Sequence, residues 1–129
     1  MKFAHLGLCY LASPYSHPSA EVRHERFVAA AKASKELMSR GVLVFSPILH
    51  SVPIVEHAGG GTAWEDWAEY DKALIRRCSA LLVLQIGGWV DSVGVGAEIE
   101  FANDWEIPVV GVSVCDYDSA VAYLVGRLS

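Results

Sequence analysis

The 129-residue sequence lacks the marks of several common protein classes. Its three cysteines, Cys9, Cys78 and Cys115, are far apart without a Cys-x-x-Cys pair, so neither a disulfide framework nor a zinc knuckle is expected. The five histidines have no paired ligand spacing, and we expect no metal site. No apolar run is long enough to cross a membrane. Together these absences indicate a cytoplasmic protein.

Charge and nucleotide-binding signatures are also scarce. Only 19% of the residues are charged and the net charge is −5, which argues against broad binding to nucleic acid polymers or anionic membranes. Gly94 and Gly96 form a G-x-G without the third glycine of a dinucleotide fingerprint. Neither a P-loop nor a G-x-S-x-G nucleophile elbow is present. A Rossmann dehydrogenase is therefore disfavoured, and we expect no cofactor.

What the sequence does contain is a regular alternation of apolar runs and helical patterns. The hydrophobic fraction of 53% and the length predict one domain over residues 1–129. We expect strands near 4–11, 42–45, 80–86 and 107–112, with a long loop at 48–61. The runs are continuous rather than alternating, which is typical of a parallel sheet covered on both faces. The predicted fold is a three-layer α/β sandwich, Rossmann-like or flavodoxin-like, with four or five parallel strands.

Four helices are expected between and after these strands. The first spans residues 20–39, with Ser19 as its N-cap, Gly41 as its stop and a buried stripe at Phe27, Ala31, Ser34 and Met38. The second opens at Thr62 with a capping box to Glu65. The third follows residue 92, and the fourth is capped by Asp118 or Ser119. The loops at the carboxyl ends of the strands should line the ligand crevice.

Two acidic residues fall on otherwise apolar helical stripes. Glu98 shares a face with Val95 and Ala102, and Asp71 lies on the stripe of the preceding helix. A carboxylate is costly to bury unless something uses it. One such group can attack the C1 carbon of a sugar while the other handles the proton of the leaving group, as in glycosyl transfer. The alternative is that helix N-termini or a structural arginine simply neutralise both acids.

Other side chains at the predicted crevice are candidates for substrate contact. Tyr10 ends the first strand, where its hydroxyl could aim a nucleophile or merely pack in the core. Ser13, Ser16 and Ser92 precede helices and could hold a phosphate, or act only as caps and turn residues. Gly94 would let the backbone or a ligand approach closely.

Basic and aromatic residues give a second, weaker set of candidates. Arg23 and Arg26 could add positive charge to a phosphate site or lie on a solvated helix face. Among the tryptophans, Trp64 and Trp67 fit the core, and Trp89, in a loop, is the better candidate to stack on a base. His50, in the predicted long loop, is the one histidine considered for substrate contact.

Three segments resemble a known superfamily over nearly the whole chain. Tyr10-Leu-Ala-Ser-Pro-Tyr15, Asp71 and Ser92-Val-Gly-Val-Gly-Ala-Glu98 are similar to the nucleoside 2-deoxyribosyltransferases, which include the 2′-deoxynucleoside 5′-monophosphate N-glycosidases. The segments YLASPYSHP, FSPILHS and GWVDSVGVGAE resemble more closely the branch known as domain of unknown function 1937.

The resemblance implies roles for particular residues. It implies a flavodoxin-like sheet, Glu98 as nucleophile, Asp71 as the group that handles the base proton and Tyr10 as the residue that orients the nucleophile. A serine at position 92 resembles the nucleotide hydrolases, where it contacts the 5′-phosphate, whereas Asp91 resembles the transferases. The loop after the first strand lacks the Gly-Ser-Ile-Arg of the hydrolases. The resemblance also implies a homodimer or homotetramer.

The sequence therefore predicts an N-glycosidase that cleaves the base–sugar bond of a (deoxy)nucleoside or its 5′-monophosphate, by hydrolysis or base exchange. The alternative is a non-catalytic nucleotide-binding or sensory module on the same fold.

Overall fold

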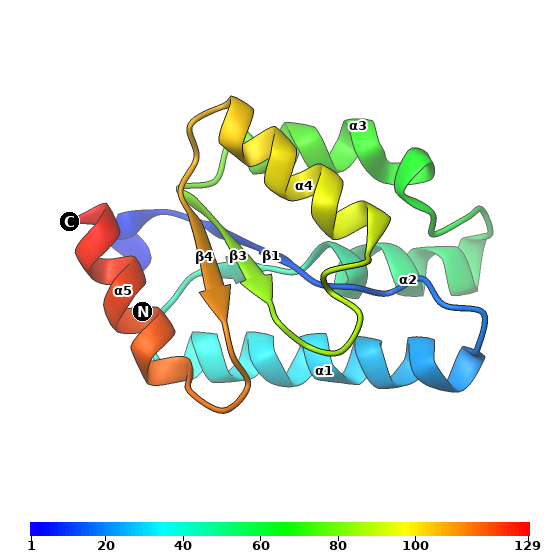
Figure 1. Cartoon of the computed structure of the whole chain (residues 1–129), viewed down its shortest axis with the longest axis horizontal. Coiled ribbons are helices and arrows are strands. Elements are labelled where there is room, and N and C mark those ends of the chain that lie inside the picture. The colour runs from blue at the N-terminus through cyan, green and yellow to red at the C-terminus, as the bar shows by residue number, and fades with distance from the viewer.

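The computed structural model describes residues 1–129 and shows an α/β fold with one parallel sheet (Figure 1). The sheet consists of β1 (Cys9–Ala12), β2 (Val44–Phe45), β3 (Ala80–Leu84) and β4 (Val109–Val112), in the order β2-β1-β3-β4. The register pairs Tyr10 with Phe45 on one side and with Leu81 on the other. This order is that of a flavodoxin-like sheet with four strands, as predicted.

Helices cover both faces of the sheet. α1 (Ala20–Ser39) and α5 (Tyr117–Leu128) pack on one face, and α3 (Trp64–Ile75) and α4 (Val93–Asp104) pack on the other. Alternate residues of each strand divide between the two cores, so that Leu11 and Leu82 face α1 and α5 while Tyr10 and Leu81 face α3 and α4. The result is the predicted three-layer sandwich. None of its helices combines the length and the apolar character that crossing a bilayer requires.

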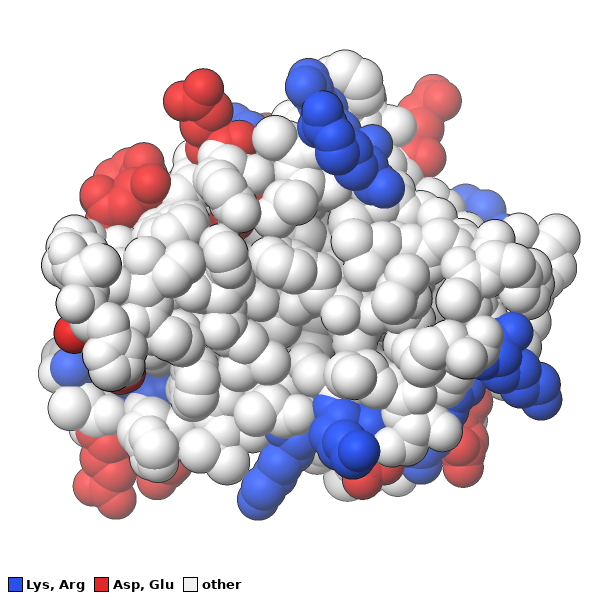
Figure 2. Space-filling view, turned by 180° about the vertical axis from the view of Figure 1, so that it is seen from behind, with Lys and Arg blue, Asp and Glu red and all other residues white.

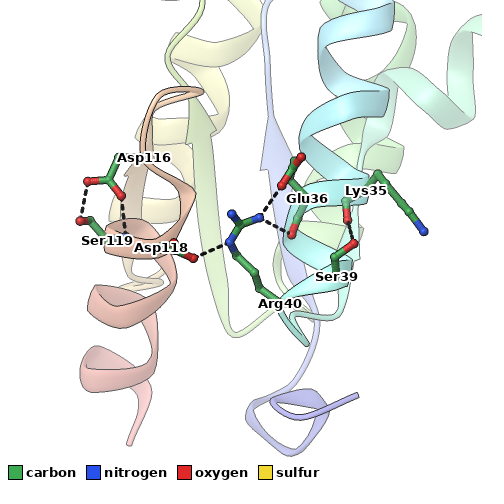
Figure 3. A network of polar contacts seen from close by, with 7 residues as sticks. All are labelled: Lys35, Glu36, Ser39, Arg40, Asp116, Asp118 and Ser119. Carbon is green, nitrogen blue, oxygen red and sulfur yellow. Dashed lines mark hydrogen bonds and ion pairs between the residues drawn. The ribbon is translucent and has the colours of Figure 1, made fainter.

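Three of the helices, α1, α3 and α4, begin at the same end of the molecule (Figure 1). In a parallel sheet each returning helix runs against its strand, so helix N-termini lie at the carboxyl ends of the strands. Figure 1 shows α1, α3 and α4 beginning on the side away from the two chain termini. At the opposite end, Arg40 Nε donates to Asp118 Oδ1 at 2.6 Å and Arg40 Nη1 donates to Glu36 Oε2 at 2.5 Å, which ties α1 to α5 (Figure 3).

The largest difference from the sequence prediction is the segment expected to be a long loop. Most of it forms α2 (Pro47–Ala58), capped by Ser46, whose Oγ accepts from the Leu49 N–H at 3.4 Å. Pro47 suits the first helical turn because its missing N–H would have no partner there. Pro53 removes one hydrogen bond within the helix, but Ile48 and Val52 bury their side chains against Ala30 of α1. Tertiary packing has therefore overridden the local signal for a loop.

The first strand also begins later than predicted, at Cys9 instead of residue 4. Residues Ala4–Leu6 form a 3₁₀ turn that ends at Gly7, where φ is +94°. A residue with a side chain would be strained at that angle, and a Cβ there would also lie 2.1 Å from Ser79 Oγ. The strand proper begins only at Cys9, because the chain must turn at Gly7 before it can pair with β2 and β3.

Smaller corrections concern helix faces and caps. In α1 the buried positions are Ala30, Ala33, Ser34 and Leu37, so Ala31 and Met38, expected to be buried, are exposed. The buried face is rotated by about one position because the helix packs against both the sheet and α2.

The α3 helix begins one residue later than predicted: the Ala63 N–H donates to Asp66 Oδ2 at 3.2 Å. The cap of α5 is Asp116, which accepts from the Ser119 N–H at 3.0 Å. Ser19 caps α1 as expected.

The face opposite to that of Figure 1 is mostly uncharged. Figure 2 shows lysine, arginine, aspartate and glutamate side chains at its margins and almost none across its centre. The centre of this face therefore presents no concentration of positive charge.

Candidate functional site

A cavity of about 360 Å³ lies at the carboxyl edge of the sheet. Its walls come from the loop after β1, the start of α2, the start of α3 and the start of α4. Its volume lies within the range found for small-molecule sites. The lining residues are Ser13, Tyr15, Ser16, Pro47, Ile48, Ser51, Thr62, Ala63, Trp64, Glu65, Trp67, Asp71, Asp91, Ser92, Val93, Gly94 and Glu98.

Glu98 is placed in this cavity by the apolar stripe of α4. Val95 and Ala102, one turn before and after it, are buried against the sheet, and the glutamate on the same stripe is only 4% exposed. The helix starts at Ser92, whose Oγ accepts from the Val95 N–H at 3.2 Å. Loss of solvation raises the pKa of Glu98 to about 8, opposed by the Tyr10 hydroxyl and reinforced by Asp71.

Tyr10 lies on the face of β1 that points toward α3 and α4, and it is fully buried. Its hydroxyl donates a hydrogen bond to Glu98 Oε2. Burial and the two neighbouring carboxyl groups raise the pKa of Tyr10 far above its ordinary value. The phenol is therefore held in its protonated form, and its one proton is donated to the glutamate.

Asp71 comes from α3, one turn before the buried Ile75, and is 8% exposed. Loss of solvation raises the pKa of Asp71 to about 6, and the neighbouring Tyr10 hydroxyl opposes this rise. The two helices that carry the acids lie side by side: Lys72 Nζ sits 5.7 Å from the ring centre of Phe101. The phenol of Tyr10 thus lies between two buried carboxyl groups from separate helices.

These raised pKa values predict an unusual dependence of stability on pH. The folded protein holds protons on Asp71 and Glu98 more tightly than the unfolded chain, so their contribution to stability falls as pH rises from about 4 to about 8. We expect the Tm of wild-type to fall by about 5 °C or more between about pH 5 and pH 8.5. The Tm of the Glu98→Gln variant should fall clearly less over the same range. Thermal unfolding followed by circular dichroism measures this. Glu100→Gln, an exposed position on the same helix, is the control and should follow wild-type. A Glu98→Gln curve parallel to wild-type would contradict the raised pKa.

The structure brings together most of the predicted site residues. Asp71 and Glu98 line the cavity together with Ser13, Ser16, Ser92 and Gly94, and Tyr10 joins the site through its hydrogen bond to Glu98. Ser13 is 6% exposed and its Oγ has no hydrogen-bond partner within the protein. Such a buried hydroxyl is costly unless a ligand or water satisfies it, so Ser13 is a good candidate for substrate contact.

Four predicted contacts lie outside the cavity. His50 stacks on Tyr70, with ring centres 5.3 Å apart, and Trp89 packs against the core beneath α4. Arg23 Nη1 donates to the His17 carbonyl at 2.5 Å, and Arg26 Nη1 donates to the Ser16 carbonyl at 2.8 Å. Both arginines therefore hold the loop after β1 in place rather than line the cavity.

The positions of the tryptophans relative to the cavity are the reverse of those expected. Trp64 and Trp67 line the cavity, whereas Trp89 does not. Trp67 Nε1 donates to the Gly61 carbonyl at 2.9 Å, which fixes the loop between α2 and α3 beside the cavity. Sequence reasoning also missed Ser51, because it lies in the unrecognised helix α2. A serine one helical turn after the apolar contact at Ile48 was the one available signal.

A family model described as a domain of unknown function (DUF1937) matches residues 7–114 of the chain. The match spans β1 through β4 and contains every residue of the cavity. No curated protein matches the chain.

Proposed function

The chain belongs to the family described as a domain of unknown function (DUF1937), and within that family we propose that it is an N-glycosidase. The substrate is a (deoxy)nucleoside or its 5′-monophosphate. The base is the leaving group, and the sugar is transferred to water or to a second base. The observation that carries the proposal is the pair of buried acids Asp71 and Glu98, which line one cavity while the Tyr10 hydroxyl donates to Glu98. Perturbed acid pairs of this kind cluster at catalytic sites.

The proposed reaction uses each group of this arrangement. The Glu98 carboxylate attacks C1′ and forms a glycosyl ester, while the C1′–N bond breaks and its electron pair goes to the base nitrogen, which takes a proton from Asp71. Water then attacks C1′ and gives a proton to Asp71, which frees the sugar and restores the Glu98 carboxylate. A second base in place of water completes an exchange instead.

The site holds the one proton that the reaction requires, but the higher pKa of Glu98 places it on the nucleophile in the free protein, so it must pass to Asp71 before the attack. At neutral pH the coupled carboxyl pair holds close to one proton, because one pKa lies near 6 and the other near 8. One ionised and one protonated carboxyl are what attack and leaving-group protonation require together. A module that only bound an anion would gain nothing from two buried acids.

The proposal is tested by incubating wild-type with ribo- and deoxynucleosides and their 5′-monophosphates, with and without a second base. Free base and exchanged nucleoside are separated by liquid chromatography. We expect free base from at least one substrate. Ligand-induced thermal stabilisation without base release from any substrate would instead identify a non-catalytic binding module.

Tyr10→Phe should lower kcat by about 10- to 100-fold. The phenol aims the Glu98 carboxylate and stabilises its ionised form, so its loss disorders the nucleophile and raises the pKa of Glu98 further. The rising limb of the pH–rate profile should therefore move to higher pH, which a purely structural defect would not produce. An unchanged kcat and profile would remove Tyr10 from the mechanism.

A further inference from the structure

The charged residue types that line the cavity are all acidic. Among its 17 lining residues are four acids, Glu65, Asp71, Asp91 and Glu98, and no lysine, arginine or histidine. Asp91 and Glu65 are exposed, and the other two are buried. Any ligand that enters therefore meets acidic side chains at both exposed and buried positions of the cavity lining.

The two arginines proposed for phosphate binding, Arg23 and Arg26, do not offset this charge within the cavity. The guanidinium of Arg23 is directed at the carbonyls of His17 and Pro18. That of Arg26 donates to the Ser16 carbonyl and packs against Gly88, and its side chain lines a separate hollow beside α1. Both cations thus lie behind the loop after β1.

The neutral polar groups of the cavity suit hydroxyls. Ser13 Oγ is buried and has no partner, and it can both donate to and accept from a sugar hydroxyl. By contrast, Ser92 Oγ already accepts the Val95 N–H of its own helix. The free amides at the start of α4 would attract an anion, but Asp91 stands directly beside them and Glu98 lies one turn and a half further along.

From these observations we infer that the cavity takes an uncharged nucleoside and discriminates against its 5′-monophosphate. The inference rests on the proposed function and names the substrate class of the same site. A dianionic phosphate would enter beside four carboxyl groups without a cation to pair with, whereas a sugar hydroxyl pairs with Ser13 at no electrostatic cost.

The test compares kcat/KM for each nucleoside with that for its 5′-monophosphate, at low and high salt. We expect the nucleoside to be favoured by about 10-fold or more at low salt, and the ratio to shrink as salt screens the carboxylates. Asp91→Asn and Glu65→Gln should each shift the ratio toward the monophosphate. Glu69→Gln, an exposed acid of α3 outside the cavity, should leave the ratio unchanged. Ser13→Ala should raise KM for the nucleoside.

The outcomes separate this inference from the function on which it rests. Equal or better use of the monophosphate by wild-type would overturn the inference and leave the N-glycosidase proposal intact. If wild-type cleaves neither compound, the proposed function is wrong, and calorimetric titration of the same pair decides the inference. Tighter binding of the nucleoside would uphold it, and tighter binding of the monophosphate, or no binding of the nucleoside, would overturn it.

Discussion

Glu98→Gln should reduce base release by at least about a thousandfold, because the amide keeps the size of the side chain but cannot form the glycosyl ester. The substitution is mild structurally: glutamine fills the same volume and can still accept from the Tyr10 hydroxyl. It also removes a carboxyl group whose ionisation is opposed by burial. The variant should therefore fold at neutral pH with a stability equal to or above that of wild-type.

The matched control for this variant is Glu100→Gln. Glu100 lies on the same helix, two residues along, but is exposed to solvent. The Glu100→Gln variant should release base at the wild-type rate within about twofold. Near-wild-type base release by Glu98→Gln, or an equal loss in both variants, would remove Glu98 as the nucleophile.

Asp71→Asn should lower kcat by about 10² to 10⁴ for substrates whose base must leave with a proton. This loss of kcat should be much smaller for 7-methylguanosine, because its cationic base leaves without needing a proton.

The pH–rate profile should change as well. Wild-type needs one proton on the carboxyl pair and should show a maximum between about pH 6 and pH 8. In the Asp71→Asn variant only Glu98 must ionise, so the descending limb should disappear.

Glu69→Gln controls for substitutions on α3, since this acid is exposed and lies outside the cavity. It should keep the wild-type rate and profile. An Asp71→Asn variant with the same deficit for 7-methylguanosine as for ordinary nucleosides would show that Asp71 does not act on the leaving group.

The parallel sheet and its layers were predictable because their signals are strong and local. Continuous apolar runs such as Ala80–Leu84 can be buried on both faces only within a covered parallel sheet. Tyr10, Asp71 and Glu98 converge because Tyr10 lies on the face of β1 toward α3 and α4, and the buried stripes of these two helices carry the acids. An acid on an apolar stripe was the most informative single feature of the sequence.

The parts that failed depend on tertiary packing. Pro53 and the glycines after it indicate a loop, yet Ile48 and Val52 stabilise α2 through contacts with α1 that no local pattern contains. The arginines Arg23 and Arg26 are close in sequence to the cavity loop, but their direction is set by which carbonyl groups that loop exposes. Which tryptophan reaches the cavity likewise depends on how helices sit on the sheet.

The most direct test of the central claim is to locate the sugar on the protein during turnover. Wild-type is incubated with a 2′-deoxy-2′-fluoro nucleoside, which slows release of a glycosyl ester, and is then quenched in acid and analysed by peptide mass mapping. The account predicts a fluoropentosyl group on the peptide that contains Glu98, together with an equal amount of free base, and neither in Glu98→Gln. Base release with the sugar attached to any other residue, or no base release from any nucleoside or nucleotide, would contradict it.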